Sequence, residues 1–150
     1  GIHAIDMFVN LFGRVKSVQA VSRRITMPYD IDDSTMILMD FENGQSGYLG
    51  SVAATGTLWQ VRAFGNKGWG NIFAHDQFTA QLTDGSFIEE SWDGYPYPGM
   101  PTIKAEMEAF AADCEGGAPF PATPDQILHA TAVLEAVITS AETGTRVTLG

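Results

Sequence analysis

The stretch STMILMDFENGQSGYLGSVAAT, residues 34–55, decides the fold. Two apolar runs flank Asn43-Gly44, and this pair predicts a tight hairpin because both central residues of a type I′ turn need a positive φ. The same pattern returns around Asn66-Lys67-Gly68 and again around Asp84-Gly85. Because such short turns can join only antiparallel neighbours, the middle of the chain is predicted to be an antiparallel meander.

Helices are predicted on both sides of this meander. Apolar residues at helical spacing occupy residues 2–12, where Gly13 ends the helix, and a strand is predicted over residues 15–24. After the meander, a helix is predicted from Thr102 to about Glu115. Its predicted inner face consists of Ile103, Met107, Phe110 and Cys114.

The last helix has the clearest start signal. Thr123 is placed as the N-cap, Pro124 takes the first helical position, and Gln126 completes a capping box. The helix is predicted to run to about Glu142, and a short strand follows in residues 145–149. The predicted inner face consists of Ile127, Ala130, Leu134, Val137, Ile138 and Ala141.

This order of elements predicts an α+β fold. Runs of strands followed by helices indicate an open, mainly antiparallel sheet of about six strands or more, with helices packed on one face. The 150 residues are enough for one domain with a core of its own.

Composition excludes several classes of protein. The net charge is −10, so nucleic acid is not an expected partner, because phosphate binding needs clustered Lys and Arg. No apolar run is long enough to span a membrane. Cys114 is the single cysteine, which excludes an internal disulfide and favours a reducing, cytoplasmic location. We expect Cys114 to be an inert thiol in the core and not a nucleophile, because no basic residue adjoins it.

The acidic cluster at residues 30–33 has two interpretations. It could bind a cation, or it could be a solvated loop. The sequence favours the loop, because the cluster lacks the ligand spacing and the distal Glu of an EF-hand.

In the strand predicted over residues 35–41, the side chains that point to either face of the sheet are mostly apolar. If helices cover one face of the sheet, the apolar side chains on the other face need a different cover. The alternatives are a central strand shielded by loops and a subunit interface, and we expect the interface, which makes the protein a homo-oligomer paired through its sheet face.

Four stretches resemble one known family. They are GIHAIDMFVNLFGRVKSV (1–18), FENGQSGYLG (41–50), VRAFGNKGWGNI (61–72) and FPATPDQILHATAVLEAVITSAETGTRVTL (120–149). In this order they resemble the C-terminal domain of the Gfo/Idh/MocA oxidoreductases, which include glucose-fructose oxidoreductase and inositol dehydrogenase.

The resemblance implies a function. Residues 1–150 would be the substrate-binding and oligomerisation domain of an NAD- or NADP-dependent oxidoreductase that acts on a sugar, polyol or related small alcohol. The family's dinucleotide-binding domain, with its Gly-x-Gly-x-x-Gly turn and its Glu-Lys-Pro motif, does not occur in this sequence. We therefore expect a truncated form that is inactive alone and binds neither cofactor nor metal. The alternative is a non-catalytic ligand-binding or dimerisation module of the same fold.

The resemblance also implies site residues. His3 aligns with a His that lies near the reacting substrate carbon, where an imidazole can accept a proton near neutral pH; alternatively it only packs the first helical turn. Asp6 could orient His3 or bind a metal together with it, and the simpler interpretation, which the sequence favours, is that it only complements the helix dipole. Trp59 could stack on a sugar ring or pack in the core, and Arg62 could clamp a polar ligand or pair with a neighbouring strand. Other residues are expected to be structural or to lie in loops: His75 and His129, Trp69 and Trp92, and Tyr95 and Tyr97, which could also belong to a lid.

Overall fold

Strands and helices follow one another in nearly the order that the sequence predicts. The structure, a computed structural model, describes residues 1–74, 76–92 and 100–150. Within these residues it contains three helices and eight strands. The chain forms two compact units, one of residues 1–55 and 121–150 and the other of residues 56–120.

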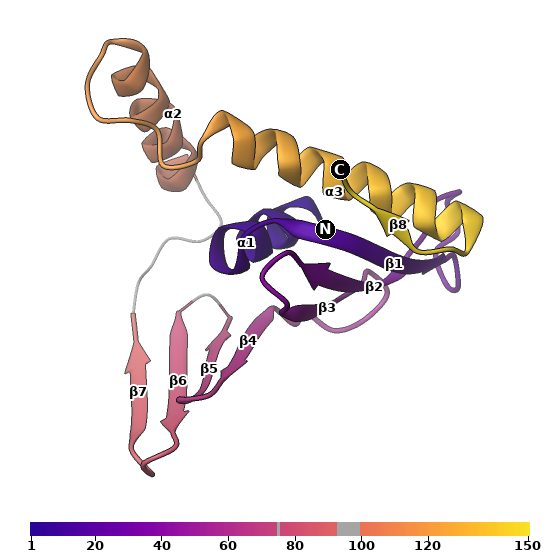
Figure 1. Cartoon of the computed structure of the whole chain (residues 1–150), viewed down its shortest axis with the longest axis horizontal. Coiled ribbons are helices and arrows are strands. Elements are labelled where there is room, and N and C mark those ends of the chain that lie inside the picture. Colours follow the sequence, from indigo (N-terminus) through magenta and orange to yellow (C-terminus); the bar gives the residue numbers. More distant parts are fainter. Residues whose placement is uncertain (75, 93–99) are drawn as a thin grey trace. The chain divides into compact units, whose positions relative to one another are not determined.

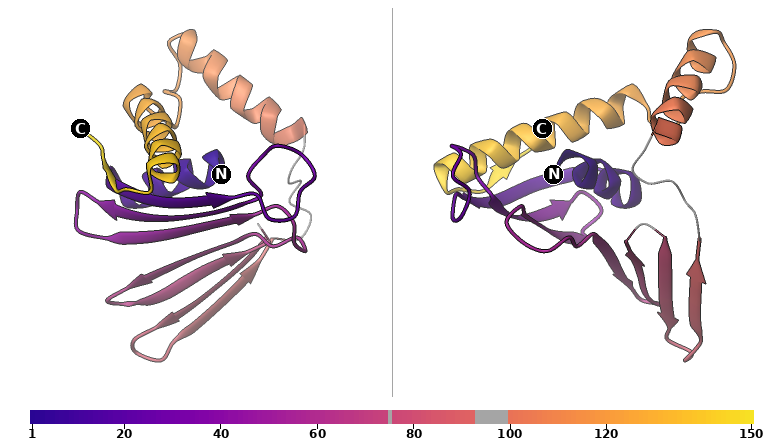
Figure 2. Two further views of the ribbon diagram at one scale, coloured as in Figure 1. Left: turned by 90° about the vertical axis from the view of Figure 1, so that its right-hand side faces the viewer. Right: turned by 180° about the vertical axis from the view of Figure 1, so that it is seen from behind.

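The first unit is a four-stranded antiparallel sheet with two helices on one face. Its strands lie in the order β3-β2-β1-β8, with β1 at Val15–Arg23, β2 at Ser34–Phe41, β3 at Ser46–Val52 and β8 at Val147–Thr148. Helix α1 (Ile2–Phe12) and helix α3 (Pro124–Thr143) cover the same face of this sheet, as Figures 1 and 2 show.

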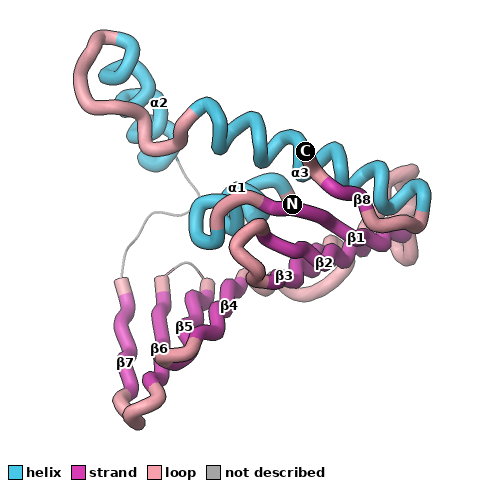
Figure 3. The backbone as a smooth tube through the Cα atoms, in the orientation of Figure 1, coloured by secondary structure: helices cyan, strands magenta, loops and turns pink. Residues whose placement is uncertain are grey.

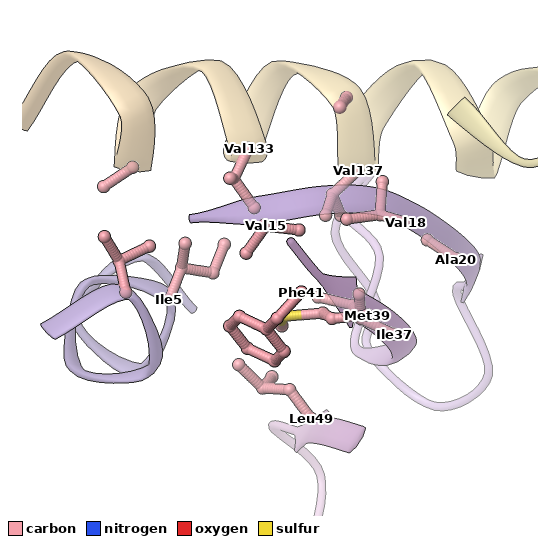
Figure 4. Close-up of a cluster of buried hydrophobic side chains, with 13 residues drawn as sticks. Ile5, Val15, Val18, Ala20, Ile37, Met39, Phe41, Leu49, Val133 and Val137 are labelled. Atoms are coloured by element: carbon pink, nitrogen blue, oxygen red, sulfur yellow. The ribbon is translucent and has the colours of Figure 1, made fainter. Parts of the chain in front are cut away.

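The core of this unit lies between the sheet and the two helices (Figure 4). A bulge in β1 shifts its register against β2 between Val15 and Ser17, so that Val15 and Val18, three positions apart, are both buried. The buried apolar side chains are Ile5, Val9, Val15, Val18, Ala20, Ile37, Met39, Phe41, Leu49, Ala130, Val133, Ala136 and Val137.

Helix α3 begins and ends as the sequence predicts. The side chain of Thr123 accepts a hydrogen bond from the Gln126 amide, and the Gln126 side chain accepts one from the Thr123 amide, which completes the capping box. Gly144 ends the helix with a left-handed φ of 70°.

The buried face of α3 differs from the predicted one. Ala130 and Val137 are buried as expected, but Ile127 and Ile138 are 46% and 51% exposed. His129, Val133, Ala136 and Ser140 are buried in their place. The reason is that His129 and Ser140 form hydrogen bonds with the backbone of β1, a requirement that hydropathy does not record.

The second unit contains the other sheet and one helix. Its strands are consecutive, β4 (Gln60–Gly65), β5 (Gly68–Phe73), β6 (Gln77–Leu82) and β7 (Phe87–Ser91), and all neighbours are antiparallel (Figure 3). Helix α2 is Met100–Cys114. The predicted α+β class is therefore confirmed, with the strands divided over two open four-stranded sheets.

The turns are in the predicted places, but two have another geometry. Phe41 pairs with Gln45 and Leu82 with Ser86, so each of these hairpins has three connecting residues. Only the last of the three, Gly44 or Gly85, has a positive φ. The turn predicted to be type I′ is thus a type I turn closed by a left-handed glycine.

Two expectations about α2 were wrong. Ile103, Met107 and Phe110 were predicted to face inward, but each is more than half exposed. Cys114 was predicted to be buried in the core, and it is exposed. The helical period shows which side of a helix is apolar, but it does not show whether a neighbour covers that side.

The acidic loop between β1 and β2 is organised by Asp33, which was expected to be solvated and is buried instead. Its carboxylate accepts hydrogen bonds from the backbone amides of Ile25, Thr26 and Met27 at 2.7–3.1 Å. These bonds favour the charged form, so the amides of Met27 and Thr26 hold the pKa of Asp33 below its ordinary value.

Replacing Asp33 by Asn is therefore expected to destabilise the fold in a pH-dependent way. Because folding lowers the pKa of Asp33, its carboxylate stabilises the fold above the pKa of the unfolded chain. That contribution is lost as the pH falls below the pKa of the unfolded chain and through the lower folded pKa. The urea midpoint of Asp33→Asn should lie below that of the parent at pH 7, and the difference should shrink in acid. Asp32→Asn, at an exposed neighbour, is the control, and equal midpoints for Asp33→Asn and the parent at pH 7 would contradict this assignment.

Candidate functional site

His3 lies in the first turn of α1 and is exposed to solvent. The turn is closed by the backbone, because the amides of Ala4 and Ile5 both donate to the carbonyl oxygen of Gly1 at 3.1 Å. Among the described residues, nothing donates to or accepts from the imidazole of His3. The ring is thus accessible to a ligand, and no contact among the described residues gives it a structural role.

The helix that carries His3 is firmly attached to the sheet. Ile5 and Val9 are buried in the core. The rings of Phe8 and Phe12 pack against the ring of Phe41, with centroids 6.4 Å and 5.6 Å away. These contacts fix α1 on β2, so His3 extends from a rigid support.

Asp6, one turn after His3, is also exposed. Within the described part of the chain, no hydrogen bond or ion pair joins it to His3. Asp6 also lies beyond the first turn of α1, which contains no acidic residue, so its role stays a prediction.

His129 makes a long-range hydrogen bond that the sequence did not reveal. Its Nε2 accepts a hydrogen bond from the buried amide of Val15 at 2.9 Å, which joins α3 to the first residue of β1. Burial, with a smaller effect of the nearby Arg14 guanidinium, lowers the pKa of His129 below its ordinary value. The neutral ring is the form that this bond requires, because a protonated imidazole has no acceptor nitrogen.

Arg14 connects the same region electrostatically. Its guanidinium lies 2.9 Å from Asp125 at the start of α3 and 3.6 Å from Glu42 in the β2–β3 turn. An open groove of about 420 Å³ lies beside these charges, lined by residues that include Leu128, Ala132 and Leu149. The charges around it are already paired, so the groove offers no free cation for an acidic ligand.

Trp59 and Arg62 belong to the second unit. Trp59 lies directly before β4, half-buried, and its carbonyl oxygen accepts the amide of Ala74 at 3.0 Å. The guanidinium of Arg62 lies over the ring of Trp69 on the neighbouring strand, 5.7 Å from its centroid. Arg62 thus has a cross-strand cation–π contact, and Trp69 lies in the sheet as expected.

The polar side chains around Arg62 are also engaged. Gln60 donates to the buried Asn71 across β4 and β5 at 2.6 Å. The register pairs Arg62 with Asn71 and Phe64 with Trp69, so polar and aromatic side chains share one face of this sheet. His75, Tyr95 and Tyr97, which the sequence singled out, lie outside the described residues.

The described residues show no cluster of metal ligands. None of them form a group of three or more His, Cys, Asp or Glu side chains that could hold a metal ion. The N-terminus of α3, where a phosphate could bind, is closed by its own capping box. Among the described helices, none is long and apolar enough to cross a bilayer.

Comparison with known proteins defines the class of fold. An oxidoreductase from Agrobacterium radiobacter, solved with NAD+, L-tartaric acid and magnesium, is similar with a TM-score of 0.82 and 19% identity over 99% of this chain and 47% of that chain. An aldose-aldose oxidoreductase from Caulobacter crescentus, complexed with glycerol, gives a TM-score of 0.78 and 22% identity over 99% and 46% of the two chains. The WlbA dehydrogenase from Bordetella pertussis, in complex with NADH and UDP-GlcNAcA, gives a TM-score of 0.73 and 18% identity over 99% of this chain and 43% of that chain. This chain therefore has a fold found in oxidoreductases, and it spans less than half the length of these three proteins.

A separate comparison, with models of protein families, matches part of the chain. The family model described as the GFO/IDH/MocA C-terminal domain matches residues 1–70, which confirms, over those residues, the resemblance seen in the sequence. The matched stretch contains His3, Trp59 and Arg62. No curated protein sequence matches the chain.

Proposed function

We propose that this chain is the substrate-binding and oligomerisation domain of an NAD- or NADP-dependent oxidoreductase. Its substrate would be a sugar, a polyol or a related small alcohol. The observation that carries the proposal is the family match over residues 1–70, because it includes the helix that presents His3. Support comes from similar structures that were solved with NAD+ or NADH and with tartaric acid, glycerol or a nucleotide sugar.

The nucleotide is assigned to another part of the same protein. The described residues lack a glycine-rich turn at the start of a helix, which a dinucleotide pyrophosphate needs. In this proposal the chain alone binds neither NAD nor NADP and is inactive. A location in the cytoplasm fits a chain with a single cysteine.

His3 is assigned the proton transfer. Oxidation of a secondary alcohol removes a hydride from carbon, which the nicotinamide takes when it is bound, and a proton from the hydroxyl oxygen. The exposed imidazole of His3, on a helix fixed by its Phe8 and Phe12 rings, can accept that proton as a general base. Trp59 and Arg62 are assigned to substrate binding, Trp59 through its aromatic face and Arg62 through guanidinium donors that remain exposed over Trp69.

Substitution of His3 tests this function in the intact protein, expressed with its upstream coding region. We expect the intact protein to reduce NAD or NADP with a polyol, and we expect His3→Ala to lower kcat by roughly 10²- to 10⁴-fold with a smaller change in KM. Asp6→Ala, one turn further along the same helix, is the matched control. A His3→Ala rate within about threefold of the parent would remove His3 from the chemistry, and an upstream region without a dinucleotide-binding domain would favour the alternative, a ligand-binding or dimerisation module.

The open face of the first sheet supports the oligomerisation role. Leu38, Tyr48 and Val21 lie on the face that α1 and α3 do not cover, and each is at least half exposed. At about 25 cal/mol per Å² of apolar area, burying a few hundred Å² per subunit contributes several kcal/mol to association. A second copy of this chain, packed through the same face, would remove these side chains from water.

The chain is therefore expected to be a dimer or a larger oligomer at micromolar concentration, with a sheet-face contact that buries more than about 1,000 Å² in total. Light scattering measures the mass directly. Leu38→Glu should produce monomers, whereas Leu11→Glu, at an exposed residue of α1, should leave the mass unchanged. A monomeric parent chain, or an oligomer that tolerates Leu38→Glu, would rule out this interface.

A further inference from the structure

One buried polar atom in the second unit has no partner. Asp76 lies in the turn between β5 and β6, and its Oδ1 is buried without a hydrogen bond from the described residues. It is the one buried side-chain oxygen or nitrogen in that part of the chain of which this is true. A buried carboxylate oxygen without a donor costs free energy, so it calls for an explanation.

The backbone beside Asp76 is strained. Ala74 has a φ of 52°, and among the described residues it is the one non-glycine with a positive φ. Its conformation is held by the hydrogen bond from its amide to the carbonyl oxygen of Trp59. Strain of this kind persists where surrounding contacts fix it, and it concentrates at binding sites. Two unfavourable features thus lie within three residues of one turn.

Two tryptophan residues lie at the same end of this sheet. Trp59 is hydrogen-bonded through its carbonyl to Ala74, and the Trp92 amide donates to the carbonyl oxygen of Asp76 at 2.9 Å. Neighbouring strands are about 4.8 Å apart, so backbone pairing places Asp76 in a row between the two tryptophans. Trp59 is half-buried and Trp92 is 46% exposed.

We propose that Asp76 is a substrate-binding residue whose Oδ1 accepts a hydrogen bond from a hydroxyl group of a sugar or polyol. This inference rests on the proposed function, and it adds to that function a carboxylate acceptor in a backbone row between two tryptophans. A polyol can bind to both kinds of side chain, because its hydroxyl groups donate hydrogen bonds to the carboxylate and its C–H groups pack against an indole. The described residues provide no second and third metal ligand near Asp76, which favours a hydroxyl over a cation as its partner.

The proposal makes a distinctive prediction about stability. If Oδ1 is unpartnered until substrate arrives, Asp76→Ala removes a desolvated acceptor without breaking a hydrogen bond. The thermal midpoint of the variant should then equal or exceed that of the parent, although binding is lost. If Asp76 instead had a structural role, the same substitution would lower the midpoint.

The experiment is an NMR titration of the 15N-labelled 150-residue chain with myo-inositol and, separately, with D-glucose, up to about 100 mM so that millimolar affinities are covered. We expect the amides of Ala74, Asp76 and Trp92 to shift in a saturable way. Asp76→Ala should weaken binding roughly tenfold to hundredfold, and Asp76→Asn should weaken it less. Asp84→Asn is the matched control, because Asp84 lies in the turn at the opposite end of the same sheet, where its side chain accepts the Ser86 amide.

The outcomes separate this inference from the proposed function. Saturable shifts around Asp76 that Asp76→Ala removes without lowering the thermal midpoint support the inference, even if the upstream region encodes no dinucleotide-binding domain. Absence of shifts with both probes, shifts that survive in Asp76→Ala, or a lower midpoint of this variant would overturn it. The oxidoreductase assignment would stand in that case if the intact protein reduces NAD or NADP.

Discussion

The structure of the first unit depends on two side chains of α3 that complete the hydrogen bonding of β1. Strand β2 pairs with β1 from Val15 to Arg23, but on the opposite side β8 pairs with β1 only at Ser17 and Val18, so the rest of that side has no neighbour among the described strands. The amides of Val15 and Ala20, on either side of that pairing, donate to His129 Nε2 and Ser140 Oγ, both at 2.9 Å. Ser140 also donates to the carbonyl oxygen of Thr145, so its hydroxyl bridges β1 and the residues that lead into β8. Each buried amide would otherwise carry the cost of an unmade hydrogen bond.

This constraint fixes the position of the remaining elements of the unit. His129 and Ser140 are eleven residues apart, about three helical turns, so they stand on one side of α3 and set the side that faces the sheet. Val133 and Val137 are then directed into the core, where they lie above β1 (Figure 4). The bond at Val15 also fixes the chain immediately after α1, the helix that presents His3. Packing against α3 thus supports the proposed proton acceptor from a distance.

The sequence predicted the features that arise from local chemistry. These features depend only on neighbouring residues, and all are present: the capping box of Thr123 and Gln126, the glycines that end α1 and α3, and the positions of the three hairpins. The features it missed depend on residues far apart in the chain. His129 and Ser140 have partners more than a hundred positions away, and Cys114 looked buried because its helix is amphipathic. The unpartnered oxygen of Asp76 has no signal in composition or spacing, because it is defined by what the fold places around it.

The central claim is that α3 anchors β1 through His129 and Ser140, and amide hydrogen exchange tests it most directly. If the two side chains are the acceptors, the amides of Val15 and Ala20 should exchange only through global unfolding, as slowly as the slowest core amides of β2. If these two amides instead exchange rapidly while the core of β2 remains protected, α3 does not complete the hydrogen bonding of β1, and the proposed support of the His3 helix would be contradicted.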